Sequence, residues 1–259
     1  MATTSAEILR DGRMTLMEHL RELRSRIIKV AIAVGVGMVI SFLFYNQMFH
    51  VLLGPYRSVV AHDSLTGGKL LITDPLEGFG IRMKFAAYGG IAIAMPVILW
   101  QLWRFVTPGL YAHEKRYAIP FLVSALALFA LGAGLAFWTL PRALEFLISI
   151  GGSGNFVTAF QPSKYFRLVT YMMLIFGIGF EFPVVLVFLQ MVGVLNVRRL
   201  TQARRYAIVG ITIVVAVITP SGDPISMLVL TIPMCLFYEV AILVGRLLER
   251  RKRAAVAAA

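Results

Sequence analysis

The chain has 259 residues, of which 59% are hydrophobic and 15% are charged. Soluble domains average roughly 45–50% apolar and about 25% charged residues, so the composition excludes an ordinary soluble domain and predicts a single integral membrane domain over residues 1–259. The formal net charge is +12, but the basic residues flank apolar segments, which indicates membrane topology rather than nucleic-acid binding.

The first predicted element is an interfacial helix over residues 14–26. Thr15 and Glu18 have the spacing of a capping box. Apolar residues then recur at helical spacing on one face, namely Leu16, Leu20, Leu23 and Ile27. This helix is expected to run directly into the first membrane span.

Six apolar stretches are predicted to cross the bilayer. A span needs about 20 residues to cross a hydrocarbon core of roughly 30 Å, and backbone groups in lipid must be hydrogen-bonded within the segment, which predicts helices. The stretches lie near residues 27–45, 77–103, 117–138, 167–193, 205–220 and 225–246. Apolar pieces in the intervening segments 46–76 and 139–166 predict short amphipathic caps.

The fifth stretch is expected to be shorter than a normal span. Only 14 residues, Tyr206 to Thr219, lie between Arg205 and Pro220. That length gives a helix of about 21 Å, less than the roughly 30 Å of the core. The sequence "TPSGDP" at 219–224 predicts a tight turn, so the last two helices should form an antiparallel hairpin.

Lysine and arginine residues predict the orientation. They cluster before the first span, in the segments after the second and fourth spans, and in the C-terminal tail. Because cytoplasmic segments carry an excess of these residues, both termini are predicted to be cytoplasmic.

The sequence contains no complete enzyme, metal-binding or cofactor-binding motif. His113 and Glu114 begin like the zinc motif H-E-x-x-H, but Tyr117 occupies the place of the second histidine. The single Cys235 excludes an intramolecular disulfide and a cysteine metal site. No nucleophile elbow or Walker loop is present. We therefore predict neither an enzyme nor a cofactor or metal.

Three acidic residues are candidates for function. Glu181 lies within the predicted fourth span, where a carboxylate is costly, so it should face a polar cavity or a partner, or be protonated. Glu114 lies in the polar segment after the second span and has two structural alternatives: pairing with a neighbouring base, or stabilising a helix N-terminus. Glu22 has an alternative too, an i,i+4 pair with Arg26.

In order and spacing, five segments of the chain resemble TatC, the core receptor subunit of the twin-arginine protein translocase. They are "HLRELRSRI" (19–27), "TDPLEGF" (73–79), "QLWRFVTPGLYAHEKR" (101–116), "GFEFPV" (179–184) and "TPSGDPIS" (219–226). The resemblance implies six transmembrane helices in a curved, glove-like bundle in a bacterial or archaeal-type cytoplasmic membrane. It also implies a receptor for Arg-Arg signal peptides of folded precursors, in a translocase driven by the proton-motive force.

The resemblance further implies roles for individual residues. The signal-peptide site would comprise Glu22, Leu23, Arg24, Phe105, Leu110, Tyr111 and Glu114, and the intramembrane glutamate would be Glu181. The implied partners are the single-span subunits TatA and TatB, which would dock around Thr219, Pro220 and the start of the sixth helix. There Met227 replaces a glutamine common in the family. We also expect a homo-oligomer within the translocase and contacts with membrane lipid.

The main alternative from another class is a proton-coupled secondary transporter of a small solute, with Glu181 as the proton site. The cytoplasmic position predicted for Glu114 and the lack of a visible internal repeat weigh against it.

Overall fold

The computed structural model describes residues 16–60, 70, 74–106, 118–150 and 161–257. Every regular element in these ranges is a helix, so the predicted all-α class is confirmed. The helices are α1 Leu16–Leu43, α2 Tyr45–Leu52, α3 Gly54–Val60, α4 Glu77–Val106, α5 Ala118–Ile150, α6 Pro162–Phe180, α7 Phe182–Met191, α8 Val197–Gln202, α9 Arg204–Ile218 and α10 Pro224–Ala257.

Within the described ranges, five segments are long and apolar enough to cross a membrane. They fall in α1, α4, α5, the α6–α7 pair and α10. The sixth predicted segment is α9, which has 15 residues and therefore a length of only about 22 Å. The prediction of a short fifth helix agrees with these bounds.

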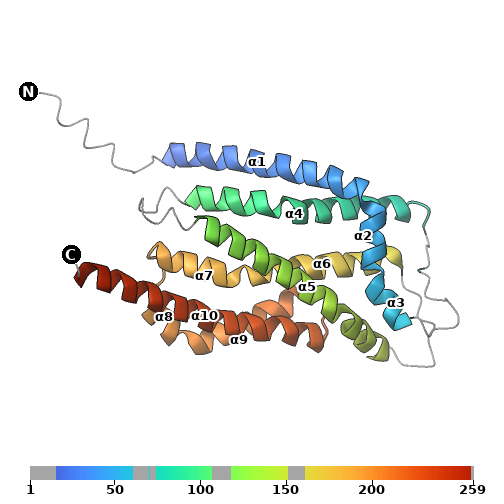
Figure 1. Ribbon diagram of the computed structural model, residues 1–259. Helices are drawn as coiled ribbons and strands as arrows, with labels where there is room; N and C mark the ends of the chain where they lie inside the picture. The colour runs from blue at the N-terminus through green and yellow to red at the C-terminus, as the bar shows by residue number, and fades with distance from the viewer. Residues whose placement is uncertain (1–15, 61–69, 71–73, 107–117, 151–160, 258–259) are drawn as a thin grey trace, which may run out of the picture.

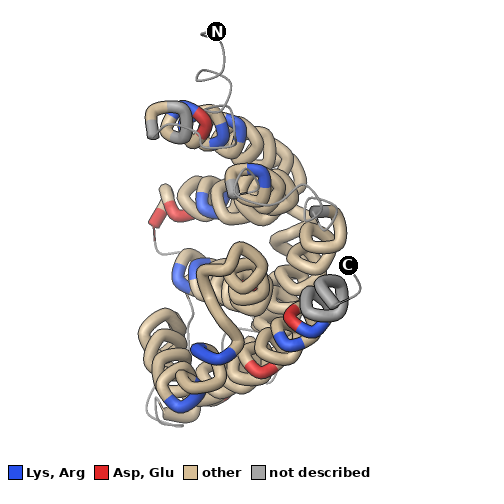
Figure 2. Tube along the Cα trace, turned by 90° about the vertical axis from the view of Figure 1, so that its left-hand side faces the viewer, with Lys and Arg blue, Asp and Glu red and all other residues tan. Residues whose placement is uncertain are grey.

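The long helices form a curved wall. α1 packs on α4, α4 packs on α6, α7 packs on α10 and α10 packs on α9, while α5 lies across α6 (Figure 1). The start of α1 and the end of α10 lie at the same end of the bundle, which we call the inner end; the opposite end is the outer end. Figure 2 looks onto the inner end and shows basic residues on several helices there.

Two short helices, α2 and α3, cover the outer end, as the apolar segment after the first span predicts. Tyr165 at the start of α6 donates a hydrogen bond from its hydroxyl to the carbonyl of Leu52 over 2.7 Å. The ring of Phe49 packs 4.7 Å from that of Phe166, and Phe85 packs 4.9 Å from Phe166. These buried aromatic contacts hold the short helices against α4 and α6.

The third span differs from its expected end near residue 138, because α5 continues to Ile150 with Pro141 inside it. Ala143 and Leu144 are almost completely buried, and α5 packs against α3. The apolar piece that predicted a separate cap therefore belongs to the same long helix. Its burial against α3 favours continuation of the helix past Pro141.

The fourth span is longer and broken. It begins at Pro162 rather than near 167, since proline suits the first turn of a helix. It is then interrupted at Glu181 between α6 and α7. The last span, α10, extends beyond the expected end at 246 through the basic tail to Ala257.

Glycines set two close helix crossings. A Cβ on Gly37 of α1 would lie 2.5 Å from the carbonyl oxygen of Gly90 in α4, which no side chain tolerates. Gly132 of α5 meets the backbone of Phe176 in α6 in the same way, whereas Gly134, two residues later, has open space. Small residues at these crossings allow the backbones to approach closely.

Candidate functional site

The inner ends of α1 and α4 carry a polar cluster made of Glu22, Arg26 and Gln101. Arg26 forms an ion pair with Glu22 one turn away, and its Nε donates to Glu22 Oε1 over 3.1 Å. The Nη1 of Arg26 also donates to Gln101 Oε1 in α4 over 3.2 Å. The i,i+4 pair considered from the sequence therefore forms, and it is tied to a second helix.

The carboxylate of Glu22 is only half engaged. Its side chain is 20% exposed, and Oε2 is buried without a hydrogen-bond partner among the described residues. One oxygen is thus held by Arg26, while the other remains able to accept a hydrogen bond. Because the cluster joins two helices, the orientation of this carboxylate is fixed by more than its own helix.

Neighbouring predicted residues lie on the same end. Leu23 is half-buried and Arg24 is exposed. Phe105 is half-buried in the last turn of α4 and follows Gln101 by four residues, so both lie on one helix face. Leu110, Tyr111 and Glu114 lie outside the described residues. The structure therefore brings together the α1 and α4 parts of the predicted site, and the remaining part stays a prediction.

Gln101 is a residue that the sequence reasoning missed. It is 9% exposed and accepts a hydrogen bond from Arg26. An amide in an apolar stretch, one turn before Phe105, is the sequence signal that could have indicated it. Arg26 is more than a local partner of Glu22, because it also reaches Gln101 in α4.

Glu181 occupies the break between α6 and α7. Pro183 has no backbone N–H to continue the helical ladder, and the backbone N–H of Glu181 bonds to the carbonyl of Ile178 over 3.0 Å, three residues back. The side chain is 8% exposed. Its Oε1 is buried and has no hydrogen-bond partner in the part of the chain that is described.

The hairpin between α9 and α10 is held by its own polar groups. Thr219 is 6% exposed, and its hydroxyl donates to the carbonyl of Val215 over 2.6 Å. Asp223 accepts the backbone N–H of Ser226 over 2.6 Å and a hydrogen bond from the Ser221 hydroxyl. Gly222 has φ +60, a conformation that glycine adopts without strain. The sequence "TPSGDP" therefore forms the predicted tight turn.

The three predicted docking residues differ in accessibility. Pro220 is exposed, Met227 is half-buried against the core, and Thr219 is buried. One exposed side of α9 offers a larger apolar surface. Val209, Ile213 and Val217 are spaced four residues apart and are 58%, 59% and 80% exposed, so they form one stripe along the helix.

The family model "Sec-independent protein translocase protein (TatC)" matches residues 18–233. A TatC protein of Aquifex aeolicus is 39% identical, covering 93% of this chain and 98% of the relative. One of Frankia casuarinae is 38% identical, covering 93% of this chain and 68% of the relative. The crystal structure of a twin arginine translocase receptor, TatC, superposes with a TM-score of 0.74 at 38% identity, covering 89% of this chain and 99% of that one.

Proposed function

The chain belongs to the TatC family of Sec-independent protein translocase proteins, and we propose that it is the subunit that recognises Arg-Arg signal peptides. As a family member it is a multi-pass component of the inner membrane and of a protein translocase, not an enzyme. The comparisons do not favour the alternative of a small-solute transporter.

The observation that supports a site for peptide arginines is the buried carboxylate oxygen Oε2 of Glu22. A buried carboxylate oxygen without a partner among the described residues is an unfavourable arrangement unless a donor arrives. A guanidinium supplies several planar N–H donors and binds carboxylates more specifically than an ammonium group does. Glu22 lies at the inner end, where a newly made precursor would meet the protein.

Glu22 alone is not a sufficient receptor for two arginines. Arg26 already neutralises it through their ion pair, and Arg24 is exposed beside it, so the local charge without another acid is positive. Two incoming arginines therefore require a second carboxylate. We propose Glu114 for this role, because it belongs to the segment that follows Phe105 in the chain.

The apolar part of a signal peptide would lie against the remaining residues of the predicted site. Leu23 and Phe105 supply half-buried apolar surface at the ends of α1 and α4. We propose that Leu110 and Tyr111 extend this surface, and that Arg24 contributes to the site's polar edge.

The proposed partners are the single-span subunits TatA and TatB. We propose that they pack on the α9 stripe of Val209, Ile213 and Val217 and on exposed Pro220. Buried Thr219 would position the turn, while Met227 would contribute packing rather than a hydrogen bond. The exposed apolar face of α9 suits packing by a second transmembrane helix, because van der Waals contacts drive helix association in lipid. We further propose that the chain forms a homo-oligomer within the translocase.

The test is a binding measurement with Arg-Arg and Lys-Lys versions of one signal peptide. Glu114→Gln should weaken Arg-Arg binding by about tenfold, since the charge-assisted part of the hydrogen bonds is on the order of 1–3 kcal/mol. Glu249→Gln, an exposed acid on α10, is the matched control and should leave binding unchanged. If Glu114→Gln keeps both normal affinity and the preference for Arg-Arg, the proposed reader is wrong.

A further inference from the structure

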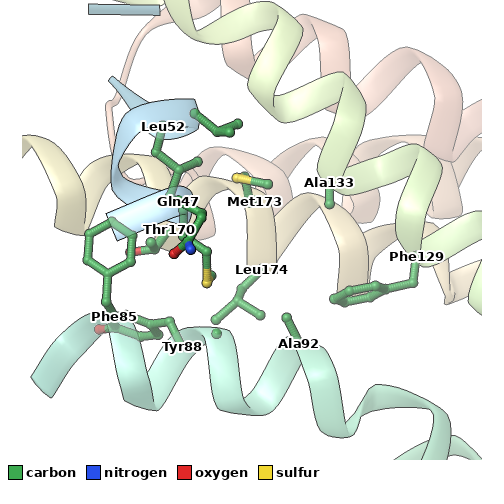
Figure 3. A pocket seen from close by; sticks show the side chains of 13 residues that line it. Gln47, Leu52, Phe85, Tyr88, Ala92, Phe129, Ala133, Thr170, Met173 and Leu174 are labelled. Atoms are coloured by element: carbon green, nitrogen blue, oxygen red, sulfur yellow. The ribbon is translucent and has the colours of Figure 1, made fainter. Parts of the chain in front are cut away.

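Two cavities in the outer half of the bundle have Tyr88 in common among the residues that line them. The first is apolar, has a volume of about 360 Å³, and lies between α2, α4, α5 and α6. Figure 3 shows Ala92 and Leu174 from α4 and α6 and Ala133 from α5 around it. This volume lies within the ~300–1,000 Å³ typical of small-molecule sites.

The second cavity is basic and has a volume of about 470 Å³. Lys164, Arg167 and Tyr171 of α6 line it together with Pro220 and Ser221 of the α9–α10 turn. Lys164 and Arg167 are exposed. Among the described residues, neither side chain has an ion pair or a hydrogen bond, so both cations can receive an anion.

The two cavities use adjoining faces of α6. Lys164, Arg167 and Tyr171 follow one another at spacings of three and four residues, and so share one face. Thr170, Met173 and Leu174 line the apolar cavity from the neighbouring face. The side chain of Tyr88 contributes to both cavities, so a charged compartment near the start of α6 adjoins an apolar compartment further along it.

The level of this site relative to the bilayer follows from two contacts. The backbone N–H of Ser163 donates to Glu77 Oε1 over 2.9 Å, which places the outer ends of α4 and α6 side by side. The α9–α10 turn reaches the same cavity although α9 has only 15 residues. We expect the bilayer to thin around this short helix, which would bring outer-leaflet headgroups toward Pro220 and Arg167.

We propose that these two neighbouring cavities together bind an anionic phospholipid of the outer leaflet. Its phosphate would lie between Lys164 and Arg167, and one acyl chain would enter the apolar cavity past Tyr88. The apolar compartment distinguishes a lipid from a free anion, and the cations of Lys164 and Arg167 distinguish an anionic lipid from a neutral one. This site lies away from the Glu22 cluster and does not depend on the proposed peptide binding.

The test is native mass spectrometry of the full chain in detergent, titrated with phosphatidylglycerol or phosphatidylcholine bearing the same acyl chains. Phosphatidylglycerol should bind at least tenfold more tightly. Lys164→Gln with Arg167→Gln should remove this preference, because each basic residue contributes about fivefold. Arg57→Gln with Arg142→Gln removes two other exposed charges from the outer half and should change the affinity less than twofold.

A second pair of variants tests the acyl-chain compartment. Ala133→Leu places a larger side chain in the cavity and leaves less room for an acyl chain, so it should weaken binding of both lipids. Ala127→Leu, on the exposed face of α5, should not weaken binding. Inorganic phosphate at millimolar concentration should not displace the lipid. Equal binding of the two lipids, equal loss in the control pair, displacement by phosphate or full binding by Ala133→Leu would each overturn the proposal. Melting temperatures without lipid show that each variant is folded.

Discussion

Gly132 of α5 lies directly against the carbonyl group of Phe176 in α6, where a Cβ would be 2.8 Å from the carbonyl carbon. Gly132→Ala should therefore force the two helices apart and lower stability by about 1–3 kcal/mol, the usual cost of overpacking. Gly134→Ala is the control, because its Cβ would meet open space and alanine favours helix. Melting in detergent should show a lower midpoint for Gly132→Ala only; equal midpoints would contradict the close crossing.

Replacing Glu181 is expected to affect the stability of the protein and its export activity in different ways. Its Oε1 has no hydrogen-bond partner among the described residues, so Glu181→Leu loses no hydrogen bond at that atom. The substitution also removes a carboxylate, whose placement in the membrane interior costs about 2.5–3.5 kcal/mol. The melting temperature should be unchanged or higher, while export of an Arg-Arg precursor should fall. A destabilised variant with normal export per folded molecule would show a structural role instead.

Arg204 at the inner end of α9 forms a 2.7 Å ion pair with Glu239 near the middle of α10. Both side chains are more than two-fifths exposed, so the pair should contribute no more than about 1 kcal/mol. Glu239→Gln is expected to lower the melting temperature by only a few degrees. Glu145→Gln, an exposed acid on α5, should have no effect. Loss of folded protein on Glu239→Gln would mean that this pair holds the hairpin.

Glu22 and Glu114 should behave as one site if both bind the same pair of arginines. Each single Glu→Gln variant should reduce Arg-Arg peptide affinity, and the double variant should lose less than the sum of the two free energies, because the remaining site is already disrupted. Isothermal titration with the four proteins gives this coupling. Strict additivity would place the two acids in separate sites.

The depth of α9 can be measured by spin-label accessibility along residues 205–220. Because α9 has 15 residues and measures about 22 Å, fewer consecutive positions should be shielded from water than along α4, which has 30. A shielded stretch as long as that of α4 would contradict a thinned bilayer.

The fold class followed from the sequence because long apolar segments in lipid have few alternatives to the helix. The ends of helices were less predictable. α5 passes the expected end because Ala143 and Leu144 are buried in the core, and no local pattern distinguishes such a continuation from a separate cap. The break at Glu181 was only partly visible: Pro183 indicated a kink, but not two separate helices.

The candidate site was predictable where a motif carried it. Glu22 stood in a segment that resembles the family, and its pair with Arg26 follows from helical spacing. The link from Arg26 to Gln101 joins residues 75 positions apart, and only the packing of α1 on α4 brings them together. The cavity pair at Tyr88 likewise arises from helices that are distant in sequence.

The shortness of α9 also bears on how the chain is inserted during synthesis. A segment of 15 residues is too short to enter the bilayer as a stable span by itself. The apolar part of α10, which has 27 residues, follows after a turn of only a few residues. The two helices should therefore partition into lipid together as a hairpin, so that the second helix supplies the free energy for the first. A chain that ends at residue 223 would present α9 without its partner helix, and we expect α9 to remain outside the membrane in that chain.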